Sequence, residues 1–156
     1  MEHDAPALEP VSRLEDASAS GDDAVLELRG GVRCRLGRDD PRLPVWRRMA
    51  EGSLATGMPV YVESGRDGRA VAVLPVAARL VEGIGTPDEH ERAPVALVAA
   101  TGEHFLDARH PHYVELRSQL EGARRDERPL LLAIDPRTLE ILGARRPPPG
   151  LDYVVI

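Results

Sequence analysis

Residues 104–142, HFLDARHPHYVELRSQLEGARRDERPLLLAIDPRTLEIL, decide the fold that we predict for this chain. Tyr113, Leu116, Leu120 and Ala123 recur at the spacing of three and four residues that places apolar side chains on one face of a helix. The residues between them are mostly charged or polar. The stretch therefore predicts an amphipathic helix.

The end of the same stretch predicts a β-hairpin. Pro129 cannot continue a helix and favours extended backbone before it. The unbroken apolar run Leu130–Ile134 is typical of a strand that is covered on both faces. Asp135–Thr138 has Asp and Pro at the first two positions of a type I turn. Residues 139–142 would return as the partner strand.

A similar plan occurs 70 positions upstream. When residues 25–84 are paired with 95–154, identical residues meet at Val25/Val95, Leu36/Leu106, Pro41/Pro111, Arg47/Arg117, Glu51/Glu121, Gly52/Gly122 and Pro59/Pro129. Both prolines that bracket the helix recur without a gap, which favours an internal duplication. The alternative is coincidence between two similar stretches in a chain of narrow composition.

The upstream copy is predicted in the same terms. Two alternating strands over residues 25–36 are followed by a helix that Asp39 or Asp40 caps, with Pro41 at its first position. Pro44 is awkward in that first turn, so the alternative is a start at Leu43. One stripe of that helix would form its inner face and consists of Trp46, Met49, Ala50 and Ser53. Asp67-Gly68 then predicts a second hairpin.

These elements predict an α+β fold of two ββαββ units, each with a small, mostly antiparallel sheet and one helix. We expect a disordered arm over residues 1–22, a first unit over 23–84, a linker over 85–93 and a second unit over 94–156. Leu151–Ile156 would be the last strand of the second unit. The alternative is an apolar recognition tail that adds to the edge of a sheet in another protein.

Composition limits the classes of function. The chain has 156 residues, a formal net charge of −6 and 42% hydrophobic residues, which is typical of one globular domain or two small ones. All 20 of its Lys or Arg residues are Arg, and acidic neighbours at helical spacing can neutralise them. The acidic balance argues against nucleic-acid binding, and no apolar run approaches the ~20 residues that span a bilayer.

Cys34 is the single cysteine, so a disulfide within the chain is impossible. Together with the lack of a signal peptide, this favours a cytoplasmic location. The alternation of Val32, Cys34 and Leu36 with arginines places Cys34 on the apolar side of its strand. We therefore interpret Cys34 as a small core residue.

One cluster of residues has metal-binding chemistry. His104, His110 and His112, with Asp107 between them, offer imidazoles and a carboxylate that zinc accepts. Their spacing matches no established metal motif, and histidines in a loop and at a helix start are the simpler interpretation. The chain shows no nucleophile elbow, dinucleotide fingerprint or phosphate loop, so we predict no enzyme and no cofactor.

One helix and one small sheet leave a face of the sheet to be covered. We therefore predict a non-catalytic protein-interaction or assembly module that binds a protein partner or associates with itself as a homo-oligomer. The alternative is a small-molecule or metal-binding protein with a site between the two copies, near His104, His110 and His112.

Overall fold

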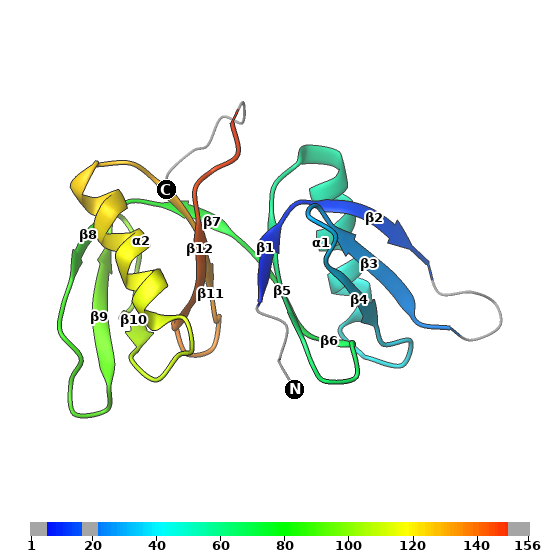
Figure 1. Ribbon diagram of the computed structural model, residues 1–156, viewed down its shortest axis with the longest axis horizontal. Coiled ribbons are helices and arrows are strands. Elements are labelled where there is room, and N and C mark those ends of the chain that lie inside the picture. Colours follow the sequence, from blue (N-terminus) through cyan, green and yellow to red (C-terminus); the bar gives the residue numbers. More distant parts are fainter. Residues whose placement is uncertain (1–5, 17–21, 150–156) are drawn as a thin grey trace. The chain divides into compact units, whose positions relative to one another are not determined.

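The computed structural model describes residues 6–16 and 22–149, and the chain divides into two compact units, Met1–Pro75 and Val76–Ile156. Each unit combines small antiparallel sheets with one helix, so the predicted α+β class is confirmed (Figure 1). The predicted strand over Leu151–Ile156 lies outside the described residues, as do residues 1–5 and 17–21 of the predicted arm.

The first unit contains six strands and one helix. In chain order they are β1 (Ala7–Glu9), β2 (Val11–Glu15), β3 (Ala24–Leu28), β4 (Arg33–Leu36), α1 (Leu43–Thr56), β5 (Val60–Ser64) and β6 (Ala70–Pro75). The strands form two antiparallel sheets, β1-β5-β6 and β2-β3-β4. A parallel bridge between Arg35 and Arg69 joins β4 to the start of β6. Helix α1 contacts β2, β5 and β6, and thus strands of both sheets.

The second unit has the same order of elements and the same pairing. They are β7 (Ala77–Arg79), β8 (Val81–Ile84), β9 (Arg92–Leu97), β10 (His104–Asp107), α2 (Tyr113–Arg125), β11 (Leu130–Ile134) and β12 (Ile141–Arg145). Its sheets are β12-β11-β7 and β10-β9-β8, with a parallel bridge between Phe105 and Glu140. Helix α2 begins 70 positions after α1, and it contacts β8, β10 and β12.

Both helices are entered through the same backbone geometry. The Asp40 N–H donates to the Gly37 carbonyl at 3.1 Å, and 70 positions later the His110 N–H donates to the Asp107 carbonyl at 2.9 Å. Helix α1 starts at Leu43, the alternative start, rather than at Pro41, and Pro44 occupies its first turn. Pro111 lies just before α2, whose N-cap is His112. A helix can start directly after such a turn because its first N–H groups need no partner within the helix.

Each unit has its own apolar core under its helix. The predicted inner face of α1 is confirmed, with Trp46, Ala50 and Ser53 buried and Met49 packed against them. The predicted stripe of α2 is confirmed as well, with Leu116, Leu120 and Ala123 buried and Tyr113 partly so. Leu130–Leu132 of β11 are also fully covered, as an apolar run between turns predicts.

The predicted boundaries need correction. Residues 7–15 of the expected disordered arm form β1 and β2, because they pair with β5 and β3 far along the chain. Residues 77–84, which we assigned to the first unit, are β7 and β8 of the second, paired with β11 and β9. The expected linker over 85–93 consists of the turn of the β8–β9 hairpin and the first two residues of β9. Each unit therefore carries two strands more at its start than the predicted ββαββ order.

One strand boundary also shifts. The return strand expected over 139–142 runs over Ile141–Arg145, because Leu139 has a φ of 68° and belongs to the turn. The Leu139 N–H donates to the Asp135 carbonyl at 2.8 Å, which closes a turn one residue longer than a type I turn.

Candidate functional site

The outer face of the β10-β9-β8 sheet carries the candidate site. Along β9, Ala93, Val95 and Leu97 are buried and belong to the core of the second unit. The alternating residues Arg92, Pro94 and Ala96 are exposed. Because successive side chains of a strand point to opposite faces, these three residues lie on the face turned away from the core.

A groove with a volume of about 950 Å³ lies on this outer face, within residues 83–139 of the second unit. Its apolar lining comes from all three strands of the sheet and from the β11–β12 turn, and consists of Ile84, Pro94, Val95, Ala96, Phe105 and Leu139. Asp88, Arg92, Glu103 and His104 add polar groups to the lining. An apolar surface with a few polar groups is typical of a binding site.

Two glycines keep parts of the groove close together. A Cβ atom at Gly85 would lie 2.6 Å from Cγ of Pro94. Gly102 has a φ of 98°, and a Cβ atom there would lie 2.5 Å from Cδ1 of Leu139. Both distances are shorter than carbon atoms tolerate, so these positions require glycine for the observed packing.

Arg92 and Phe105 form a stacked pair at one end of the groove. The Arg92 guanidinium carbon lies 4.8 Å from the centroid of the Phe105 ring, a cation–π contact. Phe105 is only 8% exposed, whereas Arg92 is exposed. Among the described residues, the Arg92 guanidinium makes no hydrogen bond or ion pair. The pair thus combines a covered apolar ring with an open cation.

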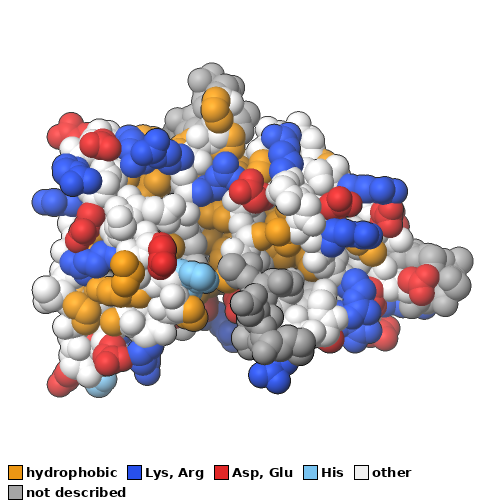
Figure 2. All heavy atoms as spheres, in the orientation of Figure 1, with side chains coloured by type: hydrophobic (Ala, Val, Ile, Leu, Met, Phe, Trp, Pro, Cys, Tyr) orange, Lys and Arg blue, Asp and Glu red, His pale blue; other side chains and the backbone are white. Residues whose placement is uncertain are grey.

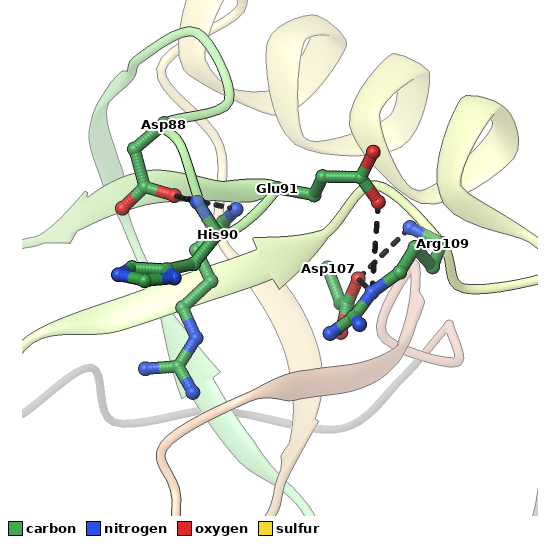
Figure 3. Close-up of polar contacts among 6 residues, drawn as sticks. Asp88, His90, Glu91, Asp107 and Arg109 are labelled. Atoms are coloured by element: carbon green, nitrogen blue, oxygen red, sulfur yellow. Dashed lines mark hydrogen bonds and ion pairs between the residues drawn. The ribbon is translucent and has the colours of Figure 1, made fainter.

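The loop beside this pair is organised by Asp88 (Figure 3). Its Oδ1 atom accepts hydrogen bonds from the backbone N–H groups of His90 at 2.8 Å and Arg92 at 3.0 Å. The backbone hydrogen bond from Arg92 is the main reason why the pKa of Asp88 lies below its usual value. Asp88 therefore acts as an ionised carboxylate that holds the loop, including Glu91 with its φ of 60°.

An ion pair between Arg109 and Asp107 closes the base of the loop. The Arg109 side chain donates to Asp107 from Nε at 3.0 Å and from Nη2 at 2.9 Å (Figure 3). These hydrogen bonds lower the pKa of Asp107 and raise that of Arg109. Glu91 Oε2 lies 3.6 Å from Nε of Arg109, and the Ala108 N–H donates to the Glu91 carbonyl at 2.8 Å. Asp107 is thereby engaged by Arg109 rather than by Arg92.

The three predicted metal ligands have different structural roles. His104 lies in β10, buried and opposite Val95 of β9. Burial, and next the charge of Arg79, lower its pKa, while a hydrogen bond to the backbone of Gly102 acts in the opposite direction. His110 Nδ1 accepts the backbone N–H of His112 at 3.0 Å at the start of α2. In residues 6–16 and 22–149, no three His, Cys, Asp or Glu side chains gather as metal ligands, so the metal prediction gains no support.

Cys34 occupies in the first unit the position that His104 occupies in the second. It lies in β4 opposite Leu26 of β3, and it is 4% exposed. Burial raises the pKa of its thiol to about 11, partly offset by a hydrogen bond with Ser64. The prediction of a small core residue is confirmed.

The outer face of the first unit carries Glu27 and Arg35 where that of the second carries Ala96 and Phe105, whereas Val25 matches Pro94. On β3 and β4 the residues that alternate with the core are Val25, Glu27, Arg33 and Arg35. The Arg35 side chain donates to the Asp67 carbonyl of the neighbouring turn.

Cations elsewhere are largely balanced by acids. Arg47 pairs with Asp16 at 2.6 Å and with Glu51, four residues along α1, at 3.9 Å, as the spacing predicts. Arg117 pairs with Glu121 at 3.0 Å. Figure 2 shows basic and acidic side chains interspersed over the face that it displays. Within the described parts of the chain, no helix is long and apolar enough to cross a membrane.

Sequence reasoning missed the groove because residues 85–93 were assigned to a linker. A signal was present in the alternation of β9, where Pro94 and Ala96 stand on the side that the first unit gives to charged residues. Comparison of the chain with protein-family models, with curated proteins and with solved structures gives no match.

Proposed function

We propose that this chain is a non-catalytic protein-interaction module, and that the groove on the second unit binds an extended, apolar segment of a partner protein. The groove lies on the outer side of a sheet whose inner side is already covered by α2. When a partner covers an apolar surface, the free energy falls by about 25 cal/mol for each Å² of apolar area that is removed from water.

The observation that carries the proposal is the difference between the two outer faces. The first unit builds the same strands in the same order with Glu27, Arg33 and Arg35 outside. The scaffold therefore does not require Ala96 and a stacked Phe105 on that side. Residues that the fold does not need, but that form an open apolar groove, support a role in binding.

We infer further that the two units arose by duplication of one ancestral unit. Three features support this inference: the common order of elements, the common strand pairing, and the offset of 70 positions between the two helix starts. The recurrence of Pro59 and Pro129 before β5 and β11 adds to it. On this account the groove is a specialisation that the second copy acquired.

Photo-crosslinking tests the proposed surface. p-Benzoylphenylalanine is placed at Ala96 in the groove, or at Glu27 on the corresponding face of the first unit as the matched control. Each protein is irradiated in a lysate of the source cells, and the adducts are mapped by mass spectrometry. We expect position 96 to label one continuous segment of a partner, with competition by excess unmodified chain but not by its Ala96→Arg variant.

The pattern of adducts decides the result. Equal labelling from both positions, or no adduct from position 96, would contradict the proposal. A partner segment taken from a second copy of this chain would establish self-association, which together with the cytoplasmic location stays a prediction.

A small-molecule site is the second candidate, because the groove volume of about 950 Å³ lies within the range of ligand pockets and His104 contributes to its lining. Native mass spectrometry of protein purified without metal or chelator tests it. A stoichiometric small-molecule adduct that is lost in the Ala96→Arg variant would favour this function. An adduct-free wild-type spectrum would leave the protein segment as the occupant.

A further inference from the structure

Arg92 is a cation held in place without the use of its hydrogen-bonding groups. Its guanidinium is stacked on Phe105 at 4.8 Å, and its backbone is held on both sides, by the Arg92 N–H to Asp88 Oδ1 at 3.0 Å and the Asp88 N–H to the Arg92 carbonyl at 3.0 Å. Stacking on an aromatic face leaves the edge of the guanidinium open. Its N–H donors are thus presented at the end of the groove.

Three acids near Arg92, in the preceding loop and across the strand pair, have other partners. Glu91, the direct neighbour of Arg92, lies 3.6 Å from Nε of Arg109. Asp88 accepts two backbone hydrogen bonds, and Asp107, which lies opposite Arg92 in the β9–β10 ladder, is held by two hydrogen bonds from Arg109. Both carboxylates act on Arg92 through their charge, but neither fills its donors. A carboxylate from outside would therefore find donors that are already oriented.

The charge at the opposite end of the groove has the other sign. Glu103 is exposed and directly precedes β10. Arg92 lies opposite Asp107 in the strand register, at the far end of β10. Four residues of extended chain separate these ends by about 13 Å. The apolar lining between them is formed by Pro94, Ala96 and Phe105. The groove thus has the open donors of Arg92 at one end and the acid Glu103 at the other.

We propose that Arg92 is the specificity-determining residue of the groove, and that it binds an acidic side chain of the partner segment whose apolar side chains lie over Pro94, Ala96 and Phe105. The inference rests on the proposed function and adds the chemistry of the partner to it. Alternate residues of an extended segment point to the same face, so the segment would carry apolar, apolar and acidic side chains at every second position. Glu103 orients the segment by repelling an acid at the other end.

Capped peptides test this chemistry on the full chain. The probes are Ac-Leu-Ser-Leu-Ser-Glu-NH2 and its reversed sequence Ac-Glu-Ser-Leu-Ser-Leu-NH2, each with a counterpart in which Gln replaces Glu. Binding to the 15N-labelled protein is followed by the amide signals of Ala96 and Phe105. In at least one chain direction we expect the Glu peptide to bind about fivefold more tightly than its Gln counterpart, as one charge-assisted contact at an exposed site provides.

Three variants assign the effect. Arg92→Gln should abolish the preference for Glu while the Gln peptide binds as before. Arg33→Gln removes an exposed arginine from the corresponding face of the first unit and should leave the preference unchanged. Glu103→Gln should also retain it, because that side chain lies at the other end.

The outcomes separate the two proposals. Equal binding of Glu and Gln peptides at Ala96 and Phe105, or a preference that survives Arg92→Gln, would overturn the role of Arg92 and leave the groove as a binding surface. If no peptide shifts these signals, the acidic partner is refuted, and the crosslinks from position 96 decide independently whether the groove binds protein.

Discussion

The two units of this chain use one scaffold for two different surfaces. Both units pair their strands in the same order, yet the outer face of β3 and β4 displays Glu27 and Arg35 where that of β9 and β10 displays Ala96 and a stacked Phe105. The inner positions constrain the fold through packing. The outer positions are free to differ, and function is best sought where they do.

Matched positions inside the units differ as well, and these differences can be tested. Ala50 of α1 corresponds to Leu120 of α2, and Ser53 corresponds to Ala123. Cys34 of β4 corresponds to His104 of β10. A substitution at each of these pairs tests whether matched residues of the two units are interchangeable.

The largest expected effect is at Leu120, which has no exposed surface. Leu120→Ala would reproduce the residue of the first unit, but it should lower the free energy of unfolding by about 2–5 kcal/mol because it leaves a cavity under α2. Urea denaturation followed by the amide signals of residues 113–134 measures the loss. Val114→Ala on the exposed side of the same helix is the control, with a change of less than about 0.5 kcal/mol. Equal effects of the two variants would show that the helix is not packed as described.

Cys34 should be unreactive in the native protein. The thiolate is the nucleophile, and burial raises the pKa of this thiol to about 11 while leaving it 4% exposed. At pH 8 we expect labelling by a disulfide reagent to be more than about a hundredfold slower in the native than in the urea-unfolded chain. Rapid stoichiometric labelling of the native chain would show that β4 opens readily. His104→Cys, at the matched position beside the groove, provides the comparison for the second unit.

Ser53 is a polar link that the second unit lacks. Its Oγ atom accepts the buried Val11 N–H at 2.8 Å and donates to the Met58 carbonyl at 2.6 Å. Ser53→Ala should destabilise the protein by about 1–3 kcal/mol, because it leaves the N–H and the carbonyl without this partner. The midpoint of urea denaturation measures the change, and Ser118→Ala on the exposed face of α2 is the control. An unchanged midpoint would mean that water replaces the hydroxyl.

His104 should make stability depend weakly on pH. Because burial lowers its pKa in the folded state, the unfolded chain binds the proton more readily. Its contribution to stability is therefore complete above the unfolded pKa of about 6.5 and is lost as the pH falls below that value toward the folded pKa. Urea midpoints at pH 7.5 and 5.5 should differ more in the wild type than in His104→Gln. A larger pH dependence in the variant would contradict the assignment.

The smallest expected effect is that of removing Leu151–Ile156. The sheets β12-β11-β7 and β10-β9-β8 of the second unit each contain three described strands. Truncation before Leu151 should leave the melting temperature unchanged. A decrease of several degrees in differential scanning calorimetry would show that the segment belongs to the folded unit.

The helices and the turns were predictable because their signals are local. The stripe of Leu116, Leu120 and Ala123, the prolines before β5 and β11, and the Asp67-Gly68 turn each depend on residues within a few positions. The strand β1 was missed, and β7 was assigned to the wrong unit, for the opposite reason. They are three residues long, and their pairing partners β5 and β11 lie about 50 positions away.

The candidate site followed the same division. The histidines were noticed because they are close in sequence, but β10 turns His104 toward the core while His110 and His112 shape the start of α2. The stacking of Arg92 on Phe105 joins residues 13 positions apart, and Leu139 reaches the groove from still farther along the chain. Spacing in the sequence could not place these side chains together.

The sequence by itself determined the α+β class, the two helices with their buried faces, the central strand Leu130–Ile134 and the core position of Cys34. Periodicity and turn chemistry act over a few residues, so they are visible without the fold. Only the tertiary structure decided where each unit begins, which strands pair, and that an apolar groove lies between an open cation and an acid. Those features arise from hydrogen bonds and contacts between distant segments, whose partners are not specified by any local pattern.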